Sequence, residues 1–314
     1  MNVTPEPSVR IVEVDVESDG QRIDNFIAKY LKGVPKSRIY RCLRKGEVRV
    51  NGGRVKASSK LVAGDKVRIP PIRISQSETP TASSGLLDKL YNSIVYEDDR
   101  MLVVNKPCGL AVHGGSGISI GVIEGMRQLR PDEKNLELVH RLDRDTSGCL
   151  MISKKSSILK KLQSFLVKKD ELEKHYLTIV HGRWSKRKQH VDLPLQKNTL
   201  NSGERISRVH PDGKQSLTRF SVEQQNGSFS LLNVQPITGR THQIRVHCAH
   251  LGHPIVGDPK YGAEQLDQAL KPKPGRLMLH AAKLVIPPLQ AGDKKTVVVA
   301  DYDERFLDMI NKIV

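Results

Sequence analysis

Hydrophobic and polar positions follow two different periodicities along the chain. Near the N-terminus, segments 21–33 and 35–46 repeat apolar residues every three or four positions and end at a glycine, which predicts two helices. Segment 47–55 alternates apolar and polar residues around Asn51, Gly52 and Gly53, which predicts a strand, a turn and a return strand. A further short strand is predicted in 63–70. These elements make a small αα-β module.

From about residue 90 the pattern is mostly that of strands. Strands are expected in the segments 93–97, 101–106, 149–152, 174–184, 277–287 and 294–300, and a hairpin in 216–239 that turns at Asn226 and Gly227. Helical spacing recurs in 155–168 and around 244–251, and a short helix ends the chain. Hairpins with a few covering helices, and no strand–helix–strand alternation, predict the α+β class with a mixed, largely antiparallel sheet.

The composition between these two regions predicts the domain boundaries. Residues 73–89 are rich in Ser, Thr and Pro and lack apolar periodicity, which is typical of a flexible linker. We therefore expect an N-terminal extension over 1–20, a small module over 21–72, this linker, and a larger domain over 90–314. The small module is expected to be mobile relative to the larger domain.

Charge is concentrated in the small module. The 314 residues include 51 Lys and Arg against 34 Asp and Glu, a net charge of +17. Fourteen of the basic residues lie between Arg22 and Arg68 with only three acidic ones, so this stretch alone carries +11. The electrostatic field of this concentrated positive charge attracts polyanions, and nucleic acid is the commonest polyanion in a cell. The second predicted helix would present its cations as one phosphate-facing stripe, formed by Arg38, Arg41, Arg44 and Lys45.

Other features of the sequence indicate in which cellular compartment the protein is expected and whether it crosses a membrane. No apolar run reaches the roughly 18 residues that a membrane span needs, and the first residues lack the pattern of a secretory signal. The four cysteines form no closely spaced pair, which argues against a disulfide framework and suits a reducing cytosol. We therefore expect a cytoplasmic protein with no membrane partner. With no apolar stripe left over, we expect a monomer.

The sequence lacks the motifs of several large enzyme classes. It contains no Walker-type phosphate loop, no dinucleotide fingerprint, no GxSxG and no HExxH. The glycine-rich stretch 113–117 reads either as a plain turn or as a loop that lets substrate approach the backbone. Four histidines between 242 and 253 resemble a metal cluster, but no cysteine pair or acidic ligand accompanies them at metal spacing, so no metal site is expected.

Two polar segments are the candidates for chemistry. Residues 140–148, HRLDRDTSG, lie between apolar strand segments, so this loop is expected at the rim of the core. A carboxylate there with arginine neighbours would stay ionised and could act as a nucleophile or stabilise a developing cation. Residues 236–262 place Arg240 and Arg245 on a predicted helix, and Arg245 could turn inward to a carboxylate. Both arginines could equally contact phosphates.

Both regions resemble known families. Segments 22–26, 35–51 and 63–70 resemble the S4-type RNA-binding domain. The motifs HRLDRDTSG and TGRTHQIRVH, with NKPxGLAVHG at 105–114, KxYL at 174–177, GHPIVGDxxYG at 252–262 and LHA at 279–281, resemble the RluA-type pseudouridine synthases. The resemblance covers nearly the whole chain and implies the pseudouridine synthase fold.

The resemblance also implies a reaction. Pseudouridine synthases break the C1′–N1 bond of a uridine, rotate the base and join C5 to C1′, which requires no cofactor or metal. The family's essential aspartate corresponds to Asp143, Arg245 would pair with it, and Tyr176 would contact the target base and assist proton removal. Arg141 would fill the gap left by the flipped nucleotide, and His140 and Arg240 are expected to contact RNA. Large-subunit (23S) ribosomal RNA is the expected partner.

Several alternatives stay open from the residues alone. Asp145 competes with Asp143 for the essential role, since both would share a face on an extended chain. The sequence does not choose between reaction at C1′ or C2′ and addition at C6. A non-catalytic RNA-binding factor and a metal-dependent nucleic-acid hydrolase are the rival functions, and replacing Asp143 by Asn would separate all three.

Overall fold

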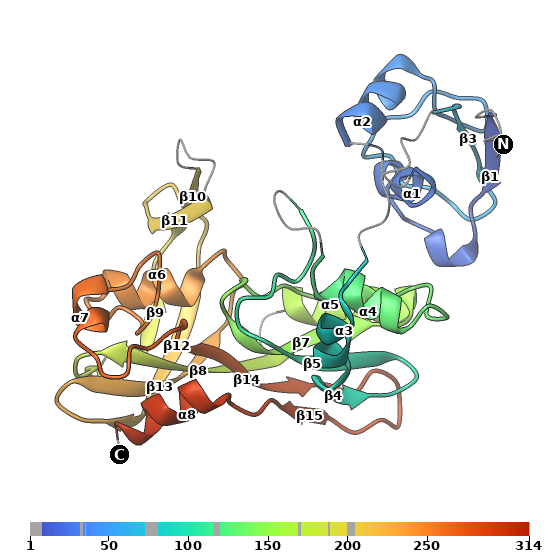
Figure 1. Ribbon diagram of the computed structural model, residues 1–314. Coiled ribbons are helices and arrows are strands. Elements are labelled where there is room, and N and C mark those ends of the chain that lie inside the picture. The colour runs from blue at the N-terminus through green and yellow to red at the C-terminus, as the bar shows by residue number, and fades with distance from the viewer. Residues whose placement is uncertain are drawn as a thin grey trace. The chain divides into compact units, whose positions relative to one another are not determined.

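The computed structural model describes residues 8–31, 34, 36–72, 81–115, 120–168, 171–187, 189–199 and 205–313. It divides into two compact units, Met1–Pro80 and Thr81–Val314, each of which is described here by itself (Figure 1). The first part of the predicted linker, 73–80, lies outside the described residues, as does the end of the glycine-rich stretch, 116–117. The last part of the linker is described: helix α3 (Ser84–Tyr91) begins inside it, because the hydroxyl of Ser83 accepts a hydrogen bond from the Leu86 N–H and caps the helix.

The first unit contains the two predicted helices, α1 (Ile23–Tyr30) and α2 (Lys36–Lys45). They pack on a three-stranded antiparallel sheet of order β1-β3-β2, formed by β1 (Arg10–Glu13), β2 (Arg49–Val50) and β3 (Lys66–Ile69). Two expectations are corrected here. The return strand after Gly53 does not form, and β2 pairs with β3 instead. Residues 10–13, assigned to an extension outside the module, form an edge strand of its sheet.

A ten-stranded sheet organises the described part of the second unit, in the order β4-β5-β7-β14-β8-β13-β12-β9, with β6 on β7 and β15 on β14 (Figure 1). Every pairing is antiparallel except that of β14 with β7, so the predicted mixed, largely antiparallel sheet is confirmed. The strands are β4 (Ile94–Glu97), β5 (Met101–Lys106), β6 (Glu137–Leu138), β7 (Ser147–Ser153), β8 (Glu173–His181), β9 (His190–Asp192), β12 (Leu217–Gln225), β13 (Phe229–Pro236), β14 (Leu279–Ile286) and β15 (Thr296–Val299).

Helices cover this sheet and fix its two-sided core. Leu102 and Val104 of β5 pack with residues of α3 and α4 (Val122–Leu129), while Met101 and Val103 face the opposite side with Leu162 of α5 (Ser156–Val167). The other half of the sheet packs against α6 (Gln243–His250) and α8 (Glu304–Asn311). Burial on both faces explains why β5 and β7 read as continuous apolar runs.

Several smaller elements carry weak sequence signals. They are the 3-10 helix η1 (Val16–Ser18), helix α7 (Glu264–Gln268), and a separate two-stranded sheet of β10 (Leu195–Thr199) and β11 (Arg205–Val209). None of these was predicted, and neither was α4.

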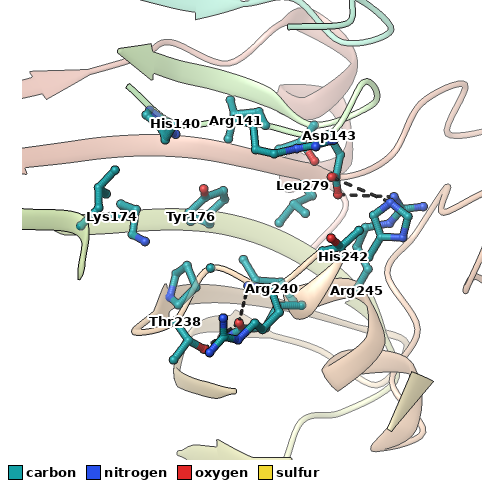
Figure 2. Close-up of a pocket in the computed structure, with 18 of the residues that line it drawn as sticks. His140, Arg141, Asp143, Lys174, Tyr176, Thr238, Arg240, His242, Arg245 and Leu279 are labelled. Carbon is teal, nitrogen blue, oxygen red and sulfur yellow. Dashed lines mark hydrogen bonds and ion pairs between the residues drawn. The ribbon is translucent and has the colours of Figure 1, made fainter. Parts of the chain in front are cut away.

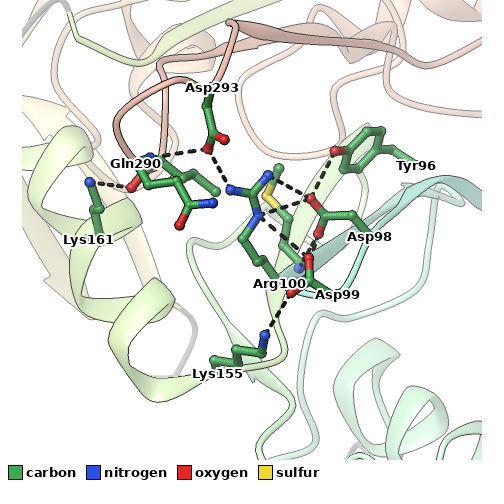
Figure 3. A network of polar contacts seen from close by, with 10 residues as sticks. Tyr96, Asp98, Asp99, Arg100, Lys155, Lys161, Gln290 and Asp293 are labelled. Carbon is green, nitrogen blue, oxygen red and sulfur yellow. Dashed lines mark hydrogen bonds and ion pairs between the residues drawn. The ribbon is translucent and has the colours of Figure 1, made fainter.

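A polar network fixes the turn between β4 and β5 (Figure 3). Asp98 accepts hydrogen bonds from the backbone N–H groups of Arg100 and Met101, and from the hydroxyl of Tyr96. The Arg100 guanidinium reaches the Asp293 carboxylate at 2.5 Å, in the loop before β15. The network thus ties an edge hairpin to a loop nearly 200 residues away and has a structural role.

Candidate active site

A cavity of about 360 Å³ lies where three segments of the second unit meet (Figure 2). The loop after β6 contributes the stretch from Val139 to Asp143 and Thr146, strand β8 contributes Lys174 and Tyr176, and the segment 236–245 leads into α6. The two polar segments that the sequence singled out therefore form opposite walls of one cavity.

Asp143 lies in this wall with its side chain 20% exposed. Its Oδ2 is 3.6 Å from Nη1 of Arg245, and its Oδ1 is 3.8 Å from Nε2 of His242. The Thr146 N–H donates to the Asp143 carbonyl at 3.2 Å, so the loop turns back on itself here. The carboxylate faces the Arg245 guanidinium and the His242 ring but is held by no short hydrogen bond to either, and it stays accessible from the cavity.

The turn separates Asp143 from its rival. Asp145 lies in a bent segment and not on an extended chain, and it forms an ion pair with Arg144 at 3.1 Å. It lines a different cavity, of about 910 Å³, together with Cys108 and Arg276. The expectation that the two carboxylates share a face is wrong, and Asp143 is the one that faces the smaller cavity.

Arg245 is almost fully buried and serves two carboxylates. Its Nε and Nη2 donate to Asp258 at 2.8 and 2.6 Å, a bidentate pair. Burial opposes the charge on Arg245, but the bonds to Asp258 and the charges of Asp258 and Asp143 outweigh it and raise the pKa of the guanidinium. The predicted approach of Arg245 to Asp143 is present, while its tighter partner, Asp258, was not predicted.

His242 is a second group beside Asp143 that the sequence did not identify as part of the site. Its φ of 55° is rare for a residue with a side chain and marks local strain at the start of α6. The Tyr261 hydroxyl accepts from the Ser207 N–H and lies 2.8 Å from Nδ1 of His242. When the hydroxyl donates its proton to Nδ1, a neutral ring carries its own proton on Nε2, the nitrogen that faces Asp143. Burial lowers the pKa of His242 in spite of the Asp143 charge.

Tyr176 forms the floor of the cavity from β8. Its hydroxyl has no hydrogen-bond partner among the residues that the structure describes. Burial, reinforced by the nearby Asp143 charge, raises the pKa of the phenol well above its usual range. The ring is therefore an apolar, uncharged surface next to the carboxylate.

His140 and Arg141 lie side by side in sequence but differ in environment. Nε2 of His140 accepts a hydrogen bond from the Met151 N–H at 3.1 Å, and burial lowers its pKa to about 3. His140 is thus neutral and attaches the loop to β7. Arg141 is exposed at the cavity edge. Arg240 also lies at this edge, but in the turn before α6 and not on the helix as predicted, where its Nε donates to the Gln215 carbonyl at 3.0 Å.

A buried lysine fixes the loop that carries Asp143. The Lys106 ammonium is fully buried and donates to the carbonyls of Pro107, Leu110 and Arg144 at 2.8–2.9 Å. Burial lowers its pKa to about 8. In the sequence, only its place in the NKP motif singles out Lys106. The apolar periodicity of its strand does not indicate that this lysine is buried or that it holds the loop.

The basic stripe of the first unit lies on α2. Arg41, Arg44 and Lys45 are exposed, and Arg38 is half-buried. Among the described residues none of the four forms an ion pair. The exposed Tyr40 lies between them, with its hydroxyl donating to Asp24 at 3.1 Å. This face therefore presents unneutralised positive charge to solvent.

The histidines of 242–253 do not converge. His247 lies between the hydroxyls of Ser216 and Thr218, and Nδ1 of His253 is 3.0 Å from the His181 carbonyl. In the described part of the chain no group of three or more His, Cys, Asp or Glu side chains is placed to hold a metal ion. Nor is any described helix long and apolar enough to cross a membrane.

Comparison with known proteins agrees with this geometry. The family description "RNA pseudouridylate synthase" matches residues 100–250, and "S4 domain" matches residues 21–67. The chain is 54% identical to ribosomal large subunit pseudouridine synthase C of Escherichia coli K12 over 286 residues, which are 90% of this chain and 89% of that protein. The enzyme of that name from Yersinia pestis is 51% identical over 90% of this chain and 88% of its own length.

Solved structures share the fold. Human RNA pseudouridylate synthase domain containing 1 is 27% identical, has a TM-score of 0.55, and is matched over 83% of its length by 67% of this chain. Human RNA pseudouridylate synthase domain containing 4, at 24% identity and a TM-score of 0.59 over 73% of this chain and 95% of that one, shares the fold. The motifs around Asp143 and Arg245 lie within residues 100–250, and with 54% identity over 90% of its length to a pseudouridine synthase the chain belongs to the RNA pseudouridylate synthase family.

Proposed function

We propose that this protein isomerises specific uridines of large-subunit (23S) ribosomal RNA to pseudouridine, with Asp143 as the essential carboxylate. The observation that carries the proposal is an accessible carboxylate 3.6 Å from a buried guanidinium, in the wall of a cavity that Tyr176 floors. The choice of ribosomal RNA follows from the names of the relatives that match nearly the whole chain. Such a substrate also favours the predicted cytoplasmic location.

The cavity suits a nucleotide taken out of its stack. C1′ and C5 of a uridine are shielded within an RNA helix, so the target must flip out, and Arg141 at the cavity edge is placed to occupy the vacated position. The ribose would then lie against Asp143 and the base against Tyr176. His140, being neutral and bonded to Met151, orders the loop and supplies no charge to the RNA.

The reaction then needs a carboxylate, a held base and two proton transfers. The N1–C1′ bond breaks, the C5–C1′ bond forms, the C5 proton leaves, and N1 gains a proton. Asp143 can stabilise or bond the carbon that loses the base, since Arg245 keeps its charge in place without blocking its oxygens. The raised pKa of Tyr176 keeps its phenol protonated at neutral pH, which favours the role of a contact surface over that of the base that removes the C5 proton.

The first unit supplies general RNA affinity in this proposal. Its exposed cations would contact phosphates, which bind RNA without reading its sequence. Specificity for particular uridines would come from RNA shape around the catalytic cavity.

Replacing Asp143 by Asn tests the function directly. The variant is isosteric, so binding to a ribosomal RNA fragment is expected to persist while pseudouridine formation, measured by tritium release from [5-³H]uridine RNA, falls below detection. Asp145→Asn is the matched control and is expected to retain most activity, since its carboxylate lines another cavity. A wild-type protein that binds RNA but forms no pseudouridine would favour a binding factor, and chain cleavage abolished by a chelator would favour a hydrolase.

A further inference from the structure

Lys174 lies beside Tyr176 in the catalytic cavity (Figure 2). The two residues are separated by one position on β8, and alternate residues of a strand point to the same face, so both side chains leave the sheet toward the cavity. The carboxylate chemistry of Asp143 makes no use of this lysine. Its place next to the floor of the cavity makes it part of the surface that a bound nucleotide would meet.

The ammonium of Lys174 has no partner within the described residues, neither an ion pair nor a hydrogen bond. Two other shielded lysines show what is usual in this protein. Lys106 donates to three carbonyls, and Lys154 bonds Glu97 and Glu133 at 2.7 and 3.0 Å. Burial without compensation lowers the pKa of Lys174, and such burial is unfavourable. An anion from outside the protein would supply the missing partner.

Lys174 also lies at the junction of two cavities. With Leu166 and Pro236 it lines both the catalytic cavity and a neighbouring one of about 190 Å³. The smaller cavity continues to Gln235 and Arg219. An RNA strand that occupies both cavities must place the phosphodiester between two nucleotides at this junction, and that group is the negatively charged part of the strand.

We propose that Lys174 binds the phosphodiester that joins the target uridine to an adjacent nucleotide, and that the smaller cavity holds this adjacent nucleotide. The inference rests on the proposed function, because it takes the flipped uridine to occupy the catalytic cavity. Lys174 would act as a positioning residue, since anchoring the phosphate fixes where the ribose stands relative to Asp143. A phosphate is favoured over the base because it carries a full charge before the reaction starts.

The test combines protein and RNA changes. RNA stem–loops carry one methylphosphonate, which removes a single backbone charge, at the linkage either 5′ or 3′ to the target uridine. Binding is measured in the Asp143→Asn background, so turnover is not required. Lys174→Gln is expected to weaken binding of unmodified RNA about 10- to 100-fold. In the protein that keeps Lys174, a methylphosphonate at one of the two linkages should weaken RNA binding by the same factor as Lys174→Gln does. When both changes are combined, the loss of affinity should be no larger than for either change alone.

Two further variants separate charge from structure. Lys174→Arg keeps the charge and should retain most of the affinity. Lys295→Gln removes an exposed lysine just before β15 that lines neither cavity, and it should leave binding unchanged. If Lys174→Gln does not fold, the methylphosphonate series on the protein that keeps Lys174 still shows whether one linkage is special.

Several results would overturn the inference. Fully additive losses at both linkages would do so, as would unchanged binding of Lys174→Gln, or a loss that appears only when the uracil O4 is replaced by sulfur, which would place the lysine on the base. Failure of the proposed function is detected by a separate measurement. It would appear as an absence of pseudouridine after RNA is incubated with the wild-type protein, whatever the binding measurements show.

Discussion

One guanidinium between two carboxylates determines the chemistry of the cavity. Asp258 takes the bidentate side of Arg245, so only Nη1 faces Asp143, at 3.6 Å. A bidentate bond to Asp143 itself would occupy the oxygens that must reach the ribose. Asp258 therefore helps by holding Arg245 in place while leaving Asp143 available to substrate.

Replacing Asp258 by Asn should affect both folding and catalysis. Breaking a buried ion pair typically costs about 3–5 kcal/mol of the free energy of unfolding. The freed guanidinium should also turn to Asp143, so single-turnover rates should fall by more than RNA affinity. Urea unfolding and rapid-quench assays measure the two effects. Asp293→Asn breaks the Arg100–Asp293 ion pair outside the cavity and is the control for loss of stability alone. If the two variants had equal single-turnover rates, Asp258 would have no effect on catalysis.

At the residue level the sequence identified some of the cavity and missed the rest. Asp143, Arg245 and Tyr176 stand in motifs whose resemblance to a family could be recognised, and the structure places all three at one cavity. Asp258 also stands in such a motif, GHPIVGDxxYG, but the resemblance assigned it no role, because its partner Arg245 is 13 residues away and only folding brings the two together. The neutral state of His140 depends on burial against β7, which periodicity does not reveal.

At the level of elements, strong periodicity gave correct predictions and weak signals did not. Helices α1, α2, α5 and α6 and strand β8 lie where apolar spacing placed them. The predicted Asn-Gly-Gly turn forms, since Val50 and Gly53 exchange backbone hydrogen bonds across it, but the return strand does not continue past this single bridge and β2 pairs with β3. Strands β10 and β11 are mostly polar and form a small sheet of their own, so no continuous apolar face marks them in the sequence.

The start of β7 depends on a glycine next to the catalytic loop. Gly148 has a φ of 105°, and a Cβ there would collide with the backbone of Ala281, its register partner on β14. Gly148→Ala should therefore destabilise the protein by several kcal/mol, because both the backbone strain and the steric clash with Ala281 oppose folding. It should also displace Asp143. Thermal unfolding and pseudouridine assays check this. Gly227→Ala, at an open hairpin turn, should change stability by less than about 1 kcal/mol.

The α2 stripe gives a prediction about salt. Changing Arg41, Arg44 and Lys45 together to Ala should weaken RNA binding and reduce the slope of log K against log salt, by up to about 0.7–0.9 for each phosphate that is no longer neutralised. The rate of the chemical step on saturating RNA should change much less. The control replaces three exposed lysines of the same unit off this helix, Lys29, Lys56 and Lys60. An unchanged slope in the α2 variant would exclude this helix as the main phosphate-binding surface.

For the whole molecule, buried histidines should set the response to acid. Burial lowers the pKa of His140 to about 3 and those of His247 and His280 to about 4. Each of them binds a proton in the unfolded chain near pH 6.5 but not in the native fold, so native stability is complete above pH 6.5 and is lost as pH falls toward 4. Three such groups give a slope of up to about 4 kcal/mol per pH unit.

Urea unfolding at a series of pH values measures this slope. His247→Gln removes one of the three protons taken up on unfolding, so it should lower the slope between pH 6 and 4 by up to about 1.4 kcal/mol per pH unit. His190→Gln, at an exposed histidine on β9, is the control and should leave the slope unchanged. A wild-type stability that stays constant down to pH 4 would mean that the three rings are protonated in the native protein.

The fold class of the whole molecule could be predicted, but the order of its strands could not. Hairpins in the sequence gave the antiparallel neighbours, such as β12 and β13. The parallel contact of β7 with β14 joins segments more than 130 residues apart, and no local pattern encodes it. That contact is nevertheless what brings the end of the HRLDRDTSG loop beside the central strands.

Strand β1 has a practical consequence for dissecting the protein. The region that matches the S4 description starts at residue 21, yet β3, the middle strand of that unit's sheet, hydrogen-bonds to Arg10–Glu13 on one side. A fragment cut at residue 21 would leave one edge of β3 without its neighbour and ready to recruit a foreign strand, which favours aggregation. Isolated RNA-binding fragments should accordingly begin upstream of Arg10.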